Sequence, residues 1–317
     1  MEIKKSFIFN NDTAKQCHAS TVLKLPNGRL IAAWFAGTAE KNDDVRIRYA
    51  VCDGDGWSAP RELPGLENAP HWNPVLFLKK NGTVRLFFKE GKRIGSWVTK
   101  YADSFDGGAT WTKPDLLVLG DATGGRGPVK NKCLRASDGT VLAPASTEKN
   151  RDWKPFIDLS YDDGDSWTKV MIPRPDGFGP LKAQMIQPTL WEDDKRVLHC
   201  LMRSKCGRLY SSASFDGGKS WETARKTDLP NNNSGIDCVR TDDGRLWLVS
   251  NPTDFSVRSP LTLSVSKDNG ITFAEAAVLE DEPGGEFSYP AIIADGNTLY
   301  ITYTWNREKI AFAVVTL

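Results

Sequence analysis

Short apolar runs, each about the length of one β-strand, alternate along the chain with polar segments rich in glycine, asparagine and aspartate. The N-terminal part shows the plan, with strand-like runs at His18–Lys24, Leu30–Phe35 and Val45–Val51 and a turn at Pro26-Asn27-Gly28. No long segment of the sequence has the apolar spacing of an amphipathic helix. Short runs separated by glycine-rich turns are typical of antiparallel sheets, so the pattern predicts an all-β protein.

An eight-residue pattern, S-x-D-x-G-x-[ST]-[WF], closes each group of strands. It occurs at Ser104–Trp111, Ser160–Trp167, Ser214–Trp221 and Ser266–Phe273, and a shortened version ends at Trp57. The closing aromatic residues are 54, 56, 54 and 52 residues apart, and so steady a period indicates a repeat architecture. Aspartate and hydroxyl side chains can hydrogen-bond within a tight turn, glycine supplies a positive φ, and the aromatic ring can pack under the sheet.

Each repeat has room for four short strands, which is the size of one propeller blade. The last copy has only three, at Tyr289–Ile293, Leu299–Thr304 and Ile310–Val315, while the N-terminal Ile3–Phe9 is left without a partner. We expect Ile3–Phe9 to supply the fourth strand, because this removes two open sheet edges. The prediction is a single domain, residues 1–317, folded as a six-bladed β-propeller. A seven-bladed ring is the alternative, and it would need about 50 further residues.

Charge and composition narrow the classes of function. The chain has 41 basic and 40 acidic residues and a net charge of +1, which argues against nucleic acid or an anionic membrane as partner. The first residues lack a signal peptide, so we expect a cytoplasmic protein, or a secreted or periplasmic one if a leader has been removed. Six cysteines and three histidines show no disulfide or ligand spacing, so we expect free thiols, no metal and no cofactor. The sequence leaves open whether the protein forms a homo-oligomer.

Polar residues open the six expected inner strands and should surround the axis on one face. They are His18, Asn73, Asn131, Gln187, Asp237 and Tyr289, at intervals of 55, 58, 56, 50 and 52 residues. Unpaired buried polar groups are costly, so such a ring indicates either a ligand site or ordered axial water.

The loops after the second strands should rise to the same face and carry charged residues. These are Glu40, Asp43, Asp44, Lys89, Glu148, Arg203, Arg258 and Arg307. The three arginines come from consecutive blades, and guanidinium groups bind carboxylates bidentately, so together they indicate an acidic ligand. Three unrelated surface salt bridges remain the alternative.

The repeated pattern resembles the Asp box, or BNR repeat, of the sialidase superfamily. The resemblance implies three arginines on the substrate carboxylate, an aspartate acid/base, and a tyrosine nucleophile activated by a glutamate. Tyr289 matches the nucleophile, Arg203 and Arg258 match the second and third arginines, and Asp44 or Asp43 matches the acid/base.

Two positions depart from that pattern, since His18 stands at the first arginine and Gln187 at the glutamate. The match is closer to a sialidase-like BNR family of about this length. The residues that carry this likeness are His18-Ala19, Asn73-Pro74, Lys130-Asn131-Lys132, Gln187-Pro188-Thr189, Asn233-Ser234-Gly235, Tyr289-Pro290 and Tyr303-Thr304-Trp305-Asn306-Arg307.

The leading hypothesis is an exo-acting glycoside hydrolase that removes a terminal acidic sugar from a glycan. Its carboxylate would be bound by Arg203 and Arg258, with Arg307 or Lys130; His18 would act as base and Trp305 would stack on the ring. The remaining polar residues, Asn73, Asn131, Lys89, Glu148 and Asp237, would complete the substrate site. The alternatives are β-elimination at a uronic acid by His18 and Tyr289, and a glycan-binding propeller without catalysis.

Overall fold

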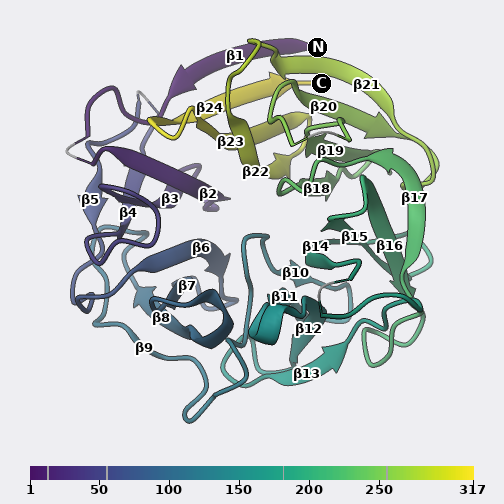
Figure 1. Cartoon of the computed structure of the whole chain (residues 1–317). Helices are drawn as coiled ribbons and strands as arrows, with labels where there is room; N and C mark the ends of the chain where they lie inside the picture. The colour runs from purple at the N-terminus through teal and green to yellow at the C-terminus, as the bar shows by residue number, and fades with distance from the viewer. Residues whose placement is uncertain (13, 55, 181, 255) are drawn as a thin grey trace.

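The computed structural model describes residues 1–12, 14–54, 56–180, 182–254 and 256–317. Within these residues, six four-stranded antiparallel sheets surround a central axis like the blades of a propeller (Figure 1). The all-β, six-bladed prediction is therefore confirmed, and the seven-bladed alternative is wrong. No helix in the described part of the chain has the length and apolar character needed to cross a membrane.

The blades follow one another along the chain. The first contains β2 (Gln16–Lys24), β3 (Leu30–Gly37), β4 (Arg46–Cys52) and β5 (Arg61–Glu62); the second contains β6 (His71–Leu78), β7 (Val84–Glu90), β8 (Val98–Ser104) and β9 (Asp115–Leu116). The third contains β10 (Leu134–Arg135), β11 (Val141–Thr147), β12 (Lys154–Ser160) and β13 (Thr168–Met171); the fourth contains β14 (Met185–Glu192), β15 (Leu198–Ser204), β16 (Arg208–Ser214) and β17 (Arg225–Pro230). The fifth contains β18 (Asp237–Arg240), β19 (Leu246–Ser250), β20 (Leu261–Ser266) and β21 (Ala274–Glu280).

The sixth blade joins the two ends of the chain. It contains β22 (Phe287–Asp295), β23 (Thr298–Trp305), β24 (Lys309–Thr316) and β1 (Glu2–Phe7). β1 runs antiparallel to β24, from Glu2 opposite Thr316 to Phe7 opposite Ala311, so the termini lie side by side in Figure 1. The predicted closure by the N-terminal strand is confirmed.

The apolar core lies between neighbouring blades. The packing of β3 explains why its residues are apolar at successive positions. Ile31 and Phe35 pack toward the second blade, in a cluster with Leu86. Ala32 and Trp34 lie on the other face, in a cluster with residues of β24. Because both faces of this strand are covered, a continuous apolar run replaces the alternation typical of a half-exposed strand.

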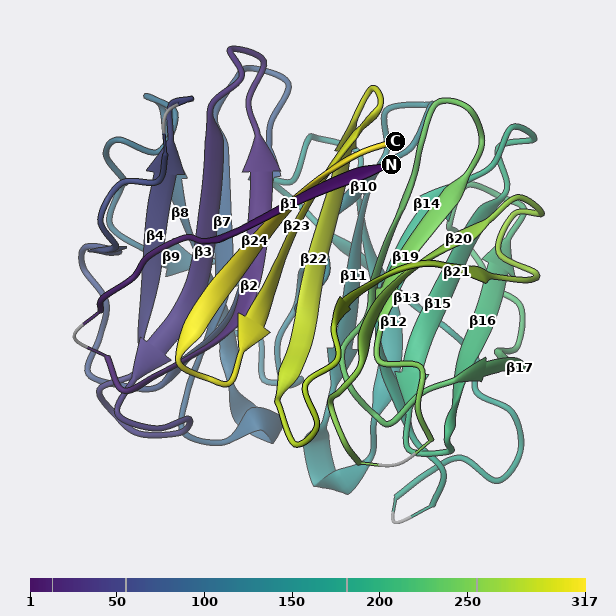
Figure 2. The same ribbon diagram turned by 90° about the horizontal axis from the view of Figure 1, so that it is seen from above.

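The Asp-box turns follow the third strand of a sheet and lie at one rim of the propeller. The loops that join second and third strands lie at the opposite rim (Figure 2). In the second blade, Asp106 accepts hydrogen bonds from the backbone N–H of Thr110 at 2.9 Å and the hydroxyl of Ser104 at 2.8 Å. The hydroxyl of Thr110 also donates to Asp106, and these bonds lower the pKa of Asp106 to about 2. The turn is therefore fixed by its own side chains.

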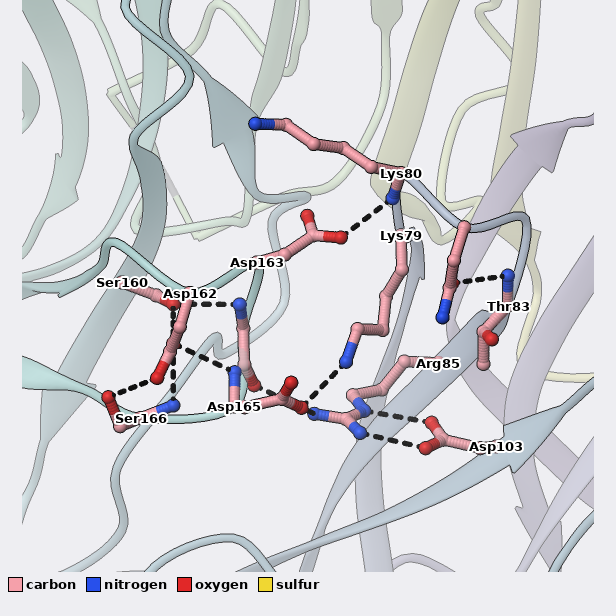
Figure 3. A network of polar contacts seen from close by, with 12 residues as sticks. Lys79, Lys80, Thr83, Arg85, Asp103, Ser160, Asp162, Asp163, Asp165 and Ser166 are labelled. Carbon is pink, nitrogen blue, oxygen red and sulfur yellow. Dashed lines mark hydrogen bonds and ion pairs between the residues drawn. The ribbon is translucent and has the colours of Figure 1, made fainter.

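The Asp-box turn of the third blade contacts the second blade (Figure 3). Arg85 of β7 donates to both carboxylate oxygens of Asp103 on β8, at 2.8 and 2.7 Å. Its Nη1 donates to the carbonyl of Gly164 at 2.7 Å and to Asp165 at 3.0 Å, both in the turn of the third blade. One buried guanidinium therefore joins two blades at the Asp-box rim.

Candidate functional site

A repeated irregularity of the inner strands shapes the axis at the rim opposite the Asp boxes. Asn73, Gln187 and Tyr289 have positive φ values of 44°, 56° and 53°, and the strand register shifts at each of them. Ala19 and Lys130 have the same conformation, at 56° and 69°. Bulges of this kind re-aim side chains, and positive φ is uncommon for residues other than glycine. The sequence period thus corresponds to a repeated backbone bulge.

The positions of the bulges differ by one residue from two of the ring positions expected from the sequence. Spacing placed His18 and Asn131 level with Gln187, but the bulged residues are their neighbours Ala19 and Lys130. Asp237 has no positive φ, and it lies two residues beyond Gly235, where an added Cβ would contact Lys130 and Tyr289. The repeat period therefore identifies the correct inner strands, but the residues it selects lie one or two positions away from the equivalent positions in the structure.

A pocket opens at this end of the axis and receives side chains from all six blades. It is lined by His18, Phe35, Glu40, Trp72, Asn73, Ile94, Trp97, Glu148, Gln187, Arg258, Tyr289 and Arg307. Phe35, Trp72 and Trp97 form a continuous aromatic wall, with centroid separations of 6.0 and 5.9 Å. The pocket therefore combines an apolar wall with a charged one, which is common in small-molecule sites.

Tyr289 is the centre of the polar contacts. Its phenol oxygen accepts a hydrogen bond from Arg203 Nη1 at 2.6 Å, and the same nitrogen donates to Gln187 Oε1 at 3.1 Å. The imidazole of His18 lies against the phenol ring, with centroids 4.2 Å apart. The guanidinium of Arg258 is 5.5 Å from the centre of the same ring. Four predicted residues from the first, fourth and fifth blades therefore surround Tyr289.

Glu286 holds the other two arginines together, and sequence analysis did not identify it as a site residue. Its Oε1 accepts hydrogen bonds from Arg258 Nη1 and Arg307 Nε, both at 2.6 Å, and Arg307 Nη1 donates to Glu40 at 2.6 Å. Burial opposes ionisation of Glu286, but the two guanidinium groups hold its pKa below the usual value. The signal in the sequence was an acidic residue three positions before Tyr289.

His18 is a buried, uncharged base. Its burial, together with the positive charges of Arg307, Arg258, Arg203 and Lys130, lowers its pKa well below the usual value. Among the described residues, its Nδ1 has no hydrogen-bond partner. The neutral imidazole of His18 keeps one nitrogen lone pair beside Tyr289, while burial and the nearby cations oppose its protonation.

The pKa of Glu148 is shifted upward, whereas that of His18 is shifted downward. Glu148 precedes the short 3-10 helix η2 (Lys149–Arg151) at the end of β11, and its burial raises its pKa, although Arg203 and Lys205 oppose the shift. A raised pKa is the shift that favours a carboxyl group as a general acid. Burial therefore gives Glu148 the property expected of the acid/base.

The two aspartates expected to be the acid/base lie apart from this pocket. Asp44 accepts hydrogen bonds from the backbone N–H and the hydroxyl of Thr38, each at 2.9 Å, and so closes its own loop. Asp43 forms an ion pair with Lys92 at 2.8 Å. Among the described residues that line the pocket, neither aspartate is present, while Glu40 from the same loop is.

Other predicted binding residues have structural partners. Lys89 is fully buried and donates to the hydroxyl of Thr99 and the carbonyl of Arg126, both at 2.7 Å. Trp305 packs against Phe7 of β1, with centroids 5.4 Å apart, so it closes the sixth blade. Neither side chain lines the axial pocket in the described structure.

Lys130, Asn131 and Asp237 join the inner strands below the pocket. Lys130 Nζ donates to Asn131 Oδ1 at 2.8 Å and to the carbonyl of Ile236 at 2.6 Å, and burial lowers its pKa to about 7. Asn131 donates to the carbonyl of Gln187 at 3.1 Å. Asp237 accepts from Lys132 at 2.9 Å and from the hydroxyl of Thr189 at 2.7 Å. These contacts form the floor of the site.

No cluster of three or more His, Cys, Asp or Glu side chains in the described residues is arranged to hold a metal ion. The six cysteines are free thiols, and those of Cys17, Cys52, Cys200 and Cys238 are buried.

Comparison with known proteins gives the same architecture. The sequence profile of the BNR repeat-like domain matches residues 28–301. A protein of unknown function from Dyadobacter fermentans superposes with a TM-score of 0.80 at 16% identity, over 99% of both chains. A Hadza microbial sialidase gives 0.79 at 18% identity, over 96% of this chain and 66% of its own. The Trypanosoma rangeli sialidase in complex with sialic acid gives 0.72 at 15%, over 99% of this chain and 59% of its own. Among curated protein sequences, none matches this chain.

Proposed function

The chain belongs to the BNR repeat-like family, and from this premise we propose that it is a sialidase-like, exo-acting glycoside hydrolase that removes a terminal acidic sugar. The observation that carries the proposal is that Arg258 and Arg307 line one pocket together with Tyr289, while Arg203 donates a hydrogen bond to the phenol oxygen of Tyr289. Sialidases of similar fold provide the context for this assignment.

The arginines provide the carboxylate-binding side of the pocket. Glu286 positions Arg258 and Arg307, and each guanidinium has five N–H donors, so donors remain for a ligand. Arg203 donates a hydrogen bond to the phenol oxygen of Tyr289. A sugar carboxylate between these groups would form charge-assisted hydrogen bonds, which are stronger than neutral ones. Phe35, Trp72 and Trp97 would contact the apolar face of the ring.

Glu148 would protonate the leaving oxygen as the glycosidic bond breaks. We assign it this role in place of Asp44 or Asp43, because Glu148 lines the pocket and burial raises its pKa. Tyr289 would attack or stabilise the positive charge at the anomeric carbon, and His18 would accept its proton, replacing the glutamate base absent at Gln187. Water would then release the sugar, with one water consumed per bond cleaved.

The contact between His18 and Tyr289 also favours a second candidate, β-elimination at a uronic acid. There His18 would remove the proton next to the carboxylate and Tyr289 would protonate the leaving oxygen. The arginines would stabilise the negative charge that develops on the carboxylate. The two reactions use the same residues but leave different products, because only elimination forms a double bond in the sugar.

A substrate screen tests both candidates. Purified protein is incubated with glycans ending in sialic acid, other ulosonic acids, uronic acids or neutral sugars, while released reducing sugar and near-ultraviolet absorbance are followed together. We expect release of an acidic sugar without absorbance, abolished in Tyr289→Phe and retained in Tyr161→Phe, which alters an exposed tyrosine at the other rim. Absorbance that grows with cleavage would identify a lyase. Binding without turnover would identify a glycan-binding propeller and contradict both candidates.

A further inference from the structure

A second cleft continues from the axial pocket across the third and fourth blades. It is lined by Ile94, Glu148, Arg151, Trp153, Lys182, Gln184 and Lys205. Ile94 and Glu148 line the axial pocket as well, so the two cavities meet at these side chains. The cleft has a volume of about 490 Å³, against about 90 Å³ for the axial pocket. The volume of the cleft is in the size range of small-molecule sites, roughly 300–1,000 Å³.

The charge of this cleft is positive. Arg151, Lys182 and Lys205 are exposed, and none of them forms a salt bridge with a described residue. The carboxyl group that lines the cleft with them is that of Glu148, and among the described residues it forms no salt bridge with any of the three. Three cations at one concave surface are therefore uncompensated in a chain whose total charge is nearly balanced.

Trp153 gives the cleft a rigid aromatic floor. Its indole is largely buried, and Lys205 Nζ lies 4.0 Å from the centre of its ring. The backbone around it is fixed, because Gln184 Nε2 donates to the carbonyl of Arg151 at 2.6 Å and to that of Gly179 at 3.0 Å. An aromatic ring beside amine groups suits a sugar that carries an anionic substituent.

We propose that this cleft binds the residue next to the terminal sugar, and that this second residue is itself anionic, bearing a carboxylate or a sulfate. The inference rests on the proposed function, because it places the scissile bond at the junction of the two cavities. Glu148 stands at that junction, where the oxygen between the two sugar residues would lie. The substrate class is then an acidic oligosaccharide, with negative charges on successive residues.

Calorimetric binding tests the proposal with galacturonic acid, its linear trimer, a neutral glucose trimer and a sulfated glucose trimer as probes. The double variant Lys182→Gln/Lys205→Gln removes two cleft charges, and Lys219→Gln/Lys226→Gln removes two exposed charges outside the cleft. We expect the cleft variant to bind an anionic trimer about tenfold more weakly than the wild type, since exposed ion pairs contribute up to about 1 kcal/mol each. Monosaccharide affinity and the control variant should be unchanged.

The outcomes separate this inference from the proposed function. A larger loss for the sulfated trimer identifies the anion as sulfate, and a larger loss for the galacturonate trimer identifies a carboxylate. Equal losses in the cleft and control variants overturn the subsite, as does a neutral trimer that binds as tightly as the anionic ones. If the monosaccharide still binds in either case, the axial site and the proposed function stand. If none of the probes binds, the anionic subsite is contradicted, and the substrate screen above decides the proposed function separately.

Discussion

The rings of His18 and Tyr289 lie against each other on the axis, with centroids 4.2 Å apart, although nearly the whole chain separates them in sequence. The closure of the ring brings them together, because His18 is on the inner strand of the first blade and Tyr289 on that of the last. The site therefore depends on the same event that completes the fold. A neutral imidazole is kept there by burial and by nearby cations.

This relationship predicts how stability depends on pH. His18 binds a proton in the unfolded chain below pH about 6.5 but stays neutral in the folded protein, so the folded state loses stability as pH falls through that value. The slope for one proton approaches about 1.4 kcal/mol per pH unit. Urea unfolding between pH 5 and 8 should show this slope in the wild type and a shallower one in His18→Asn. Val249→Ala, which is destabilised elsewhere in the core, should keep the wild-type slope; identical slopes in all three proteins would contradict the prediction.

Glu148→Gln should lower activity by about 10²- to 10⁴-fold, because it removes a general acid. The same change should raise the melting temperature at pH 7. A carboxyl group whose folded pKa is raised loses stability as pH increases above its unfolded pKa, and glutamine lacks this effect. Enzyme kinetics and thermal unfolding of one sample measure both results. Asp44→Asn serves as the comparison, and a greater loss of activity in that variant than in Glu148→Gln would return the acid role to the first-blade loop.

Glu286→Gln should weaken substrate binding more than it slows the chemical step. The variant removes the charge that positions Arg258 and Arg307, so the carboxylate-binding groups lose their common anchor. We expect KM to rise about tenfold, since charged hydrogen bonds contribute about 1.5–3 kcal/mol. Glu40→Gln, which touches Arg307 alone, should have a smaller effect. A fall in kcat at constant KM would show that Glu286 acts on the reaction and not on binding.

The fold could be predicted almost completely from the sequence, because each repeat contains its own turn signal. The four full Asp boxes fix their hairpins through local contacts such as those of Asp106, and the sequence leaves β1 over as the strand that closes the ring. Side-chain roles were harder to predict, since they depend on contacts between blades. The sequence predicts that Trp305 stacks on the sugar ring. In the structure its ring packs on Phe7, which lies at the other end of the chain.

The site differs from the prediction for a related reason. Lys89 and Glu148 hold similar positions in their repeats, yet Lys89 turns inward to Thr99 and the carbonyl of Arg126, whereas Glu148 faces the pocket. Whether a charged side chain finds a partner inside its own blade is determined by the neighbouring loop, and the period carries no information about that. The importance of Glu286 likewise follows from Arg307, which reaches it from the next hairpin of the same blade.

The contact between blades at the Asp-box rim should contribute strongly to stability but not to activity. Arg85→Met leaves Asp103 without its bidentate partner and removes the donor to Gly164, so we expect a loss of about 3 kcal/mol, typical of breaking a buried ion pair. Lys79→Met removes only the pair with the half-exposed Asp165 at the same rim and should cost less than about 1 kcal/mol. Urea unfolding measures both values, and kcat/KM on any substrate found should stay at the wild-type level. Equal and small losses would show that solvent compensates Asp103, and that packing between the sheets alone holds these two blades together.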